Sequence, residues 1–249
     1  MPMRPGVRVW LFDGGTFDVP SGLMEAGCGE RPVRIPTVWA AVSHPRGLVV
    51  VDTGPTPPAT SGSARQPFSV RDGLATMGAA PAHVRWLVNT HLHADHVGGN
   101  RLFTDATVVV QEAELDYARD PTDASMIPEY DSSLLRPGRT AYEVLDGDHD
   151  LFADGSIRIV TSAGHSPGHQ SILLRLESGR HVLLAGDAVW TARCRDPDVL
   201  PGLLWSESAY RASRARLLAL AEEHECRWVH AHEPATFAAG DWPQAQGIA

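Results

Sequence analysis

The sequence contains no lysine, since all 21 of its basic residues are arginine. This absence excludes a Schiff-base lysine and the lysine of a phosphate-binding P-loop. Long apolar runs are also missing, because no stretch approaches the ~20 residues that a membrane-spanning helix needs. The first ten residues, MPMRPGVRVW, lack the apolar core of a signal peptide. We therefore expect no membrane partner.

Cysteine is scarce as well, with only Cys28, Cys194 and Cys226 among 249 residues. An odd number of widely spaced cysteines makes neither a disulfide framework nor a CxxC metal site, which is typical of a reducing compartment. The 30 acidic residues outnumber the basic ones and give a net charge of −9. Such a chain has no general attraction for phosphate backbones. We expect a cytoplasmic protein that does not bind nucleic acid.

Short apolar segments bounded by Gly, Pro and Asp predict mixed strands and helices. The predicted strands are 7–12, 37–43, 48–51, 84–89, 107–110, 157–161, 172–176 and 182–185, and the predicted helices are 69–77, 98–103, 112–118 and 207–225. Ser206 is a suitable N-cap for the last helix. Strands and helices alternate in both halves, which indicates a layered α/β domain. Because no segment has the composition of a linker, residues 1–249 are predicted to form a single domain.

Three long segments rich in Pro, Gly or Ser are predicted to be surface loops: 19–36, 55–67 and 119–139. Loops of this length often border binding sites. Apolar residues in or beside them are therefore candidates for lining a substrate pocket, namely Leu23, Met24, Phe68, Met126, Ile127 and Tyr130. Anchoring of each loop into the core is an equally good interpretation of the same residues.

The segment 89–100, NTHLHADHVGGN, gathers three histidines and one aspartate within six residues, directly after an apolar strand. Imidazole and carboxylate groups are the zinc ligands that require no thiol. His91 and His93 alternate, so they point to one side of an extended segment, and the following turn places Asp95 and His96. A strand end followed by a loop can divide four such ligands between two adjacent metal ions. A polar surface loop is the alternative.

Three further ligand-type residues occur at the ends of apolar strands. His165 lies in the turn SAGHSPGH, Asp187 follows the strand HVLLA, and His232 ends the apolar strand WVHAH. One short carboxylate at Asp187 can bridge two zinc ions about 3.5–4 Å apart, as two-metal hydrolytic sites require. His230 competes with His232 for the last ligand position.

The combination of HLHADH, GHSPGH, Gly-Asp and the terminal HEP resembles the metallo-β-lactamase superfamily over residues 7–234. LFDGGTF, PTVWAAV and HPRGLVVVDTG are similar to its N-acyl-homoserine lactonase branch. The resemblance implies an αββα sandwich with a dinuclear site along the edge of its two sheets. It also favours His232 over His230, because HEP resembles the terminal motif of the family.

The resemblance further implies two zinc ions per chain, with iron, manganese or cobalt as alternatives. The implied ligands form two groups that share one carboxylate: His91, His93 and His165 for one ion, Asp95, His96 and His232 for the other, and Asp187 for both. Asp52 in VVDTG and His169 in the GHSPGH turn are implied to brace these ligands by hydrogen bonds.

The activity implied is the opening of an N-acyl-homoserine lactone or another small lactone, and hence quorum quenching. A hydroxide shared by the two ions would attack the carbonyl carbon, and Asp95 would pass a proton to the leaving group, unless its role is purely structural. Trp190 stands where lactonases commonly carry a tyrosine that donates a hydrogen bond to the substrate carbonyl. An indole N–H is also a donor, with a different reach and direction.

Several alternatives remain at this stage. A thioesterase similar to glyoxalase II shares the metal pattern, although few residues follow His232 for the helical extension of that family. A mononuclear iron dioxygenase and an inactive binding module have the same fold. The complete set of seven ligand positions favours the dinuclear hydrolase. The segment 19–36 resembles a region that packs between subunits in some relatives, so a homodimer is a further expectation.

Overall fold

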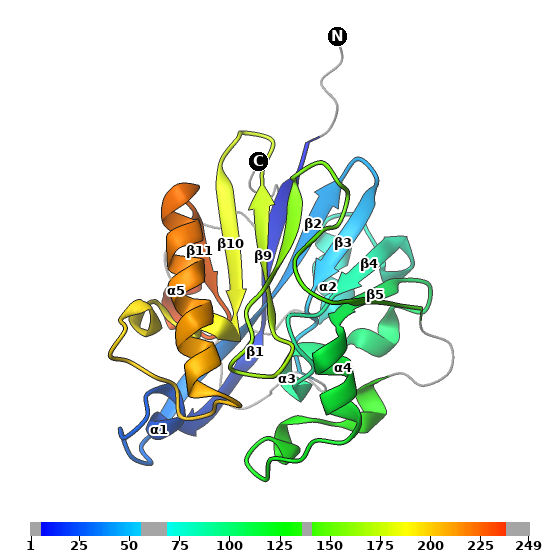
Figure 1. Cartoon of the computed structure of the whole chain (residues 1–249). Helices are drawn as coiled ribbons and strands as arrows, with labels where there is room; N and C mark the ends of the chain where they lie inside the picture. The colour runs from blue at the N-terminus through cyan, green and yellow to red at the C-terminus, as the bar shows by residue number, and fades with distance from the viewer. Residues whose placement is uncertain (1–5, 56–68, 136–140, 238–249) are drawn as a thin grey trace.

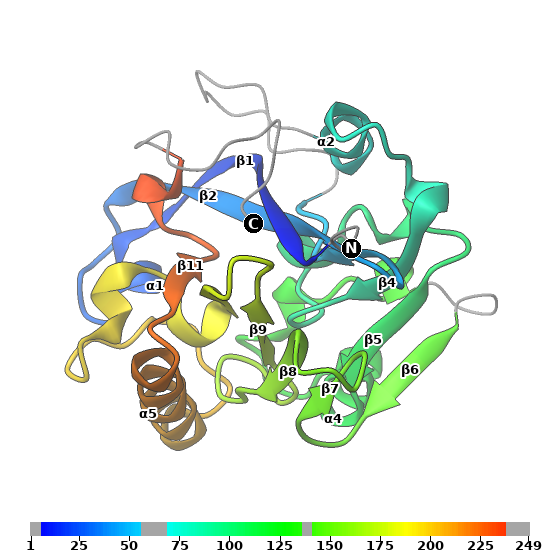
Figure 2. The same ribbon diagram turned by 90° about the horizontal axis from the view of Figure 1, so that it is seen from above.

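In the computed structural model of the protein, residues 6–55, 69–135 and 141–237 are described. They form two packed sheets with helices on the outer faces (Figures 1 and 2). In order of pairing, the first sheet contains β1 (Arg8–Pro20), β2 (Pro32–His44), β3 (Gly47–Val51), β4 (Val84–Val88), β5 (Thr107–Gln111) and β6 (Tyr142–Leu145). The second contains β11 (Arg227–His230), β10 (His181–Gly186), β9 (Gln170–Arg175), β8 (Ile157–Thr161) and β7 (His149–Asp150). The predicted αββα sandwich is confirmed.

The described α-helices are α1 (Ser21–Met24), α2 (Val70–Thr76), α3 (Ala94–Val97), α4 (Glu112–Arg119) and α5 (Glu207–Glu223). Short 3-10 turns lie at Pro81–His83, Asn100–Leu102, Ile127–Glu129, Ser132–Leu135, Asp187–Val189, Ala192–Arg195 and Pro234–Thr236. The side chain of Ser206 caps α5 as predicted, by accepting a hydrogen bond from the Ala209 N–H. Among the described helices, none combines the length and the apolar character needed to cross a membrane.

Side chains that alternate along the strands build three of the apolar layers. Leu11 of β1 packs between the two sheets, whereas the next residue, Phe12, packs under α2 on the outer face of the first sheet. In β10, Leu184 likewise faces the space between the sheets, while Leu183 faces α5. This period of two is what a strand buried on both faces requires.

Two predictions about local structure are wrong. Segment 19–36 is a loop only over residues 25–31, because β1 and β2 extend into it as a long hairpin, with Val19 paired to Val33, and α1 follows β1. The predicted helix 98–103 is instead α3 followed by the turn Asn100–Leu102. Gly98 interrupts the helix because its N–H donates to the Gly54 carbonyl, outside the helix. The strands β6 and β7 were not predicted.

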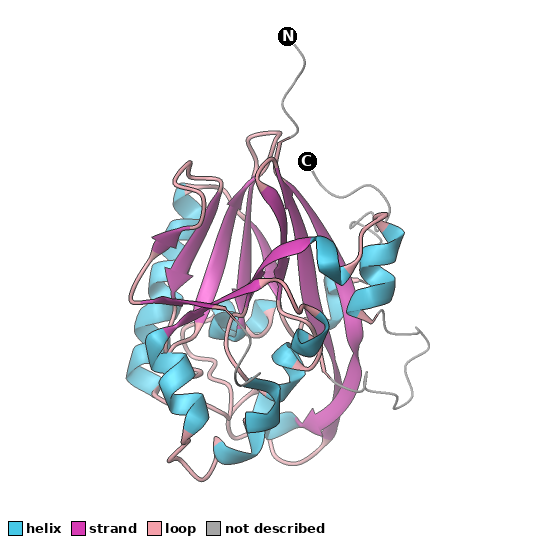
Figure 3. Cartoon of the chain, turned by 90° about the vertical axis from the view of Figure 1, so that its right-hand side faces the viewer, coloured by secondary structure: helices cyan, strands magenta, loops and turns pink. Residues whose placement is uncertain are grey.

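Several strands end at one edge of the sandwich, where loops and short helices gather (Figure 3). The strands β3, β4, β5 and β6 are parallel to one another, and so are β10 and β11. Their carboxyl ends therefore place the following loops side by side. Segment 163–168, which follows β8, lies against the start of α5 at this edge.

Replacing Gly164 with alanine is expected to destabilise the fold by about 3 kcal/mol or more. Gly164 has φ +138°, and an added Cβ would lie 2.2 Å from the backbone nitrogen of Tyr210 in α5. Gly179→Ala is the matched control, because Gly179 also has a positive φ but an added Cβ would meet nothing within 4 Å. The control should lose only about 1 kcal/mol. Urea unfolding measures both, and equal losses would contradict the packing argument.

Candidate metal centre

The seven predicted ligands converge at the edge where the strands end. His91, His93, Asp95 and His96 follow β4, and the others follow β8, β10 and β11. Their ligand atoms form three groups within 4.8 Å: His91, His93 and His165; His91, His96 and Asp187; and Asp95, His96 and His232. All are at least 98% buried except Asp95, whose side chain is 24% exposed.

Asp187 lies between the two outer groups. One carboxylate oxygen is 3.3 Å from Nε2 of His96, and the other is 3.4 Å from Nε2 of His165 and 3.2 Å from Nε2 of His232. A single carboxylate thus reaches histidines of both groups. This is the position that a carboxylate bridging two cations must occupy.

The unpartnered atoms of the cluster fit a metal ion. Nε2 of His91, His93 and His96 and Oδ1 of Asp187 are buried, and none has a hydrogen-bond partner in the described part of the chain. Buried polar atoms without partners are rare and destabilising. Imidazole nitrogens and carboxylate oxygens are donors that divalent transition metals accept. The residues present therefore fit a cationic metal centre.

The electrostatics of the cluster agree with this. Burial lowers the pKa of His91 and His93 well below the ordinary value, so both are neutral and their lone pairs are available. Burial also opposes charge on His96, but Asp95, Asp187 and Asp52 outweigh it and raise the pKa of that histidine well above its usual range. The carboxylates around His96 therefore stabilise a positive charge beside them, which either a proton or a metal ion can provide.

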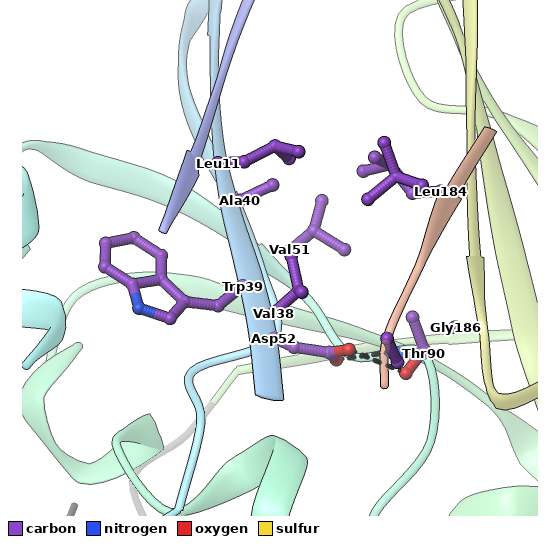
Figure 4. Close-up of a pocket in the computed structure, with 11 residues that line it drawn as sticks. Leu11, Val38, Trp39, Ala40, Val51, Asp52, Thr90, Leu184 and Gly186 are labelled. Atoms are coloured by element: carbon purple, nitrogen blue, oxygen red, sulfur yellow. Dashed lines mark hydrogen bonds between the residues drawn. The ribbon is translucent and has the colours of Figure 1, made fainter. Parts of the chain in front are cut away.

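Asp52 braces the ligand segment from the end of β3. Its Oδ1 accepts the Thr90 N–H at 2.8 Å, and its Oδ2 accepts the Thr90 hydroxyl at 2.7 Å (Figure 4). Nδ1 of His96 lies 2.9 Å from the same Oδ2. Since the carboxylate can only accept, His96 donates from Nδ1 and presents Nε2 to the centre. Asp52 also borders an apolar cavity between the sheets.

His169 holds Asp187 through the backbone of that residue. The Asp187 backbone N–H donates to its Nε2 at 2.9 Å, so the proton is on Nδ1, which donates to the Ser162 hydroxyl at 2.8 Å. Burial lowers the pKa of His169 to about 3, which keeps the ring neutral in this role. His169 therefore holds the backbone of the shared carboxylate in place.

The geometry distinguishes His232 from His230. Nδ1 of His232 lies 2.9 Å from the Pro36 carbonyl, which leaves its Nε2 facing Asp187. His230 is also buried, but its Nδ1 lies 2.8 Å from the Val189 carbonyl, and it belongs to none of the ligand groups. β11 ends at His230, two residues earlier than predicted, so His232 lies in the loop beyond the strand.

A pocket lies over the cluster and encloses about 520 Å³ of empty space, including the open solvent at its mouth. Its apolar lining consists of Phe17, Val19, Leu23, Ile35, Ala94, Trp190 and Leu203, and its polar lining consists of His93, Asp95, Glu129, His165, Asp187 and His232. The hairpin of β1 and β2 supplies much of the apolar wall. Ile35 was missed because segment 19–36 was predicted as a loop, and Phe17 was missed because the first strand was predicted to end at residue 12.

The predicted pocket residues have different positions. Trp190 lines the pocket, and the centroid of its ring is 5.2 Å from those of both His165 and His232. Met126 does not line the pocket. Its side chain is fully buried in the apolar layer that also contains Trp190. Met24 packs against that same layer, whereas Leu23, which was also a candidate, lines the pocket as predicted. Phe68 lies outside the described residues.

Sequence reasoning missed Glu114, and it named Tyr130 only as a candidate for the pocket lining, to which Tyr130 does not belong. Glu114 in α4 is fully buried and accepts hydrogen bonds from four donors around the ligand loops. Its four-residue spacing from the buried Ala118 was the available signal, because it places both on one face of α4. The ring of Tyr130 contacts that of His93, with centroids 4.7 Å apart. No spacing in the sequence indicates that contact.

Comparisons with known proteins agree with the geometry. Residues 31–225 match the family model of the metallo-beta-lactamase superfamily. The N-acyl homoserine lactonase AttM of Rhizobium johnstonii is 30% identical, over 93% of this chain and 95% of that protein.

Two solved structures share the fold. An N-acyl homoserine lactone hydrolase, with N-hexanoyl-L-homoserine bound at its catalytic metal centre, has a TM-score of 0.80 and 21% identity over 93% of this chain and 95% of its own. AidC, a dizinc quorum-quenching lactonase, has a TM-score of 0.73 and 15% identity over 92% and 88%. The family match and the full-length relative show that the chain is a metal-dependent hydrolase and belongs to the metallo-beta-lactamase superfamily.

Proposed function

We propose that the protein opens the ring of an N-acyl homoserine lactone or another small lactone, and so acts in quorum quenching. The observation that carries the proposal is the apolar pocket directly over the seven-residue cluster. An apolar wall beside a polar floor suits a substrate that joins an acyl chain to a small polar ring. The lactonase names of the relatives support the same substrate class.

We propose further that the centre holds two zinc ions. His91, His93 and His165 would hold one, Asp95, His96 and His232 the other, and Asp187 both. When bound, such ions supply a Lewis acid for a carbonyl oxygen and lower the pKa of a water molecule to about 7. The dizinc character of AidC supports two ions of this kind.

Side chains of the pocket supply the rest of the proposed chemistry. Asp95 lines the pocket and is the most exposed member of the cluster, so it is placed to pass a proton to the leaving alkoxide of the opened ring. In a lactone that alkoxide stays tethered, and the product is a hydroxy acid. Trp190 and Leu203 exclude water from one side of the centre. The indole nitrogen of Trp190 is buried and not exposed to the pocket, so the ring acts as an apolar wall and not as a donor to the substrate.

The test is hydrolysis of a lactone panel by the zinc-loaded protein, followed by acid release in a pH-stat, beside a thioester and a β-lactam. We expect acid release from the lactones and a rate that rises with an acyl chain long enough to reach Phe17 and Ile35. Turnover of the thioester alone would contradict the proposed substrate and favour a thioesterase.

His232→Gln is expected to reduce bound zinc from two ions to one per chain, because it removes one of three ligands of the second group. His230→Gln is the matched control two residues earlier. It should retain two ions, because the His230 ring contacts a backbone carbonyl and not the cluster. Mass spectrometry of metals after gel filtration measures both variants. Loss of zinc from His230→Gln with none from His232→Gln would reverse the ligand assignment.

A further inference from the structure

Glu114 is a fully buried carboxylate outside the ligand cluster. Its Oε1 accepts the backbone N–H of Leu92 at 2.9 Å and the hydroxyl of Tyr130 at 2.9 Å. Its Oε2 accepts the hydroxyl of Ser166 at 2.7 Å and the backbone N–H of Gly168 at 3.0 Å. All four donors are neutral, and together they use both oxygens of the carboxylate.

These contacts join two ligand loops that are far apart in the sequence. Leu92 lies between His91 and His93, and Ser166 directly follows His165. Those three histidines form one of the ligand groups. One carboxylate therefore connects the two loops that carry the whole three-histidine group.

The approach of the second loop to α4 is also fixed sterically. A Cβ added at Gly168 would lie 2.3 Å from the backbone nitrogen of Glu114, so only glycine fits there. This close backbone approach allows the Gly168 N–H to donate to the Glu114 carboxylate. Side-chain bonding and backbone packing thus fix the same loop at the same point on α4.

We propose that Glu114 is a positioning residue that sets the spacing of His91, His93 and His165, and so the metal affinity of that group in preference to the group of Asp95, His96 and His232. The inference rests on the metal centre of the proposed function, but not on its substrate. Groups that hydrogen-bond to the segments around metal ligands orient those ligands, and losing one typically lowers metal affinity about 10- to 100-fold. A purely structural residue would instead weaken both sites together through the loss of fold.

The test uses cobalt(II) as the probe, added stepwise to the metal-free full-length chain and followed by its visible absorption. Glu114→Gln keeps the size of the side chain but replaces one acceptor oxygen with an N–H₂ donor. We expect the three-histidine site to bind cobalt about 10- to 100-fold more weakly and with an altered spectrum. The affinity of the other site should change less than about threefold. Leu92 is on the segment that also carries Asp95 and His96, but Glu114 bonds to that segment at Leu92 alone, three residues before Asp95, and has no hydrogen bond to Asp95, His96 or His232.

Three further variants separate positioning from stability. Ile157→Ala creates a cavity in β8, at the end of the strand away from the centre, and should weaken the fold while leaving both cobalt affinities unchanged. Ser166→Ala removes one bond to Glu114 and should weaken the three-histidine site by severalfold, even if Glu114→Gln does not fold. Tyr130→Phe also removes one bond to Glu114, but it keeps the ring against His93 and comes from a segment that carries no ligand, so it should leave that affinity nearly unchanged.

Equal cobalt affinities in Glu114→Gln and the unaltered chain would overturn the proposal, as would parallel loss at both sites. An unaltered chain that binds two cobalt ions but opens no lactone would contradict the proposed substrate and leave the role of Glu114 intact. The two failures are therefore distinguishable.

Discussion

Asp187→Asn is expected to lower kcat/KM on lactones by about 10³-fold, equivalent to about 4 kcal/mol of transition-state stabilisation. Among the residues that the structure describes, Asp187 is the one carboxylate that lies within 3.4 Å of histidines from both ligand groups. An amide of the same shape carries no charge and presents a nitrogen donor where a cation must bind. The substitution therefore alters both the spacing of the two metal sites and the negative charge that attracts the ions.

The backbone at position 187 should keep its place in this variant, because His169 binds the N–H and not the side chain. The loss of activity should therefore exceed any loss of stability. Steady-state kinetics and metal content of the same sample measure the effect. Asp198→Asn is the matched control, because it removes the same charge from an exposed position outside the centre. A variant at 187 with both metals and full activity would contradict the bridging role.

The positions of the ligands were predictable because the signal is local and dense. Four ligand-type residues within six positions are rare, and each remaining ligand follows an apolar strand in the sequence. Parallel strands bring such ends to one edge, so the side chains meet whatever the details of the intervening loops. The capping serine and periodicity of α5 are likewise local signals, and that helix was predicted almost to its last turn.

The part of the pocket wall that the β1–β2 hairpin supplies was not predictable from the same signals, unlike Trp190. Pro20, Pro32 and Pro36 indicated a loop, because proline cannot donate to a sheet and is typical of strand ends and edges. The chain forms a two-stranded hairpin there, in which Phe17 pairs with Ile35 across 18 residues. Such pairing depends on contacts that no short window of sequence contains.

Glu114 shows the same limit for polar residues. In the sequence it is one of two glutamates at the start of an amphipathic helix, and its neighbour Glu112 is exposed. What distinguishes it is the arrival of Leu92, Tyr130 and Ser166 from three other segments. The hydrogen bonds of Glu114 therefore cannot be predicted until the positions of those segments in the fold are known.

Removing the metals is expected to lower the melting temperature by about 15–30 °C. In the metal-free chain, three imidazole nitrogens and one carboxylate oxygen are buried without hydrogen-bond partners among the described residues, each at a cost of about 1–3 kcal/mol. A site filled at a free metal concentration 1,000-fold above its Kd stabilises the fold by about 4 kcal/mol. For a chain of this size, each kcal/mol shifts melting by about 2–4 °C.

Calorimetry of the chelator-treated and zinc-loaded chain measures this shift. His232→Gln provides an internal comparison, because a chain that holds one ion fewer should lose about half as much on chelation. His230→Gln should lose as much as the unaltered chain, since its ring faces the Val189 carbonyl. Equal melting temperatures with and without zinc would mean that the seven side chains are satisfied without a cation, and the centre would then need a different explanation.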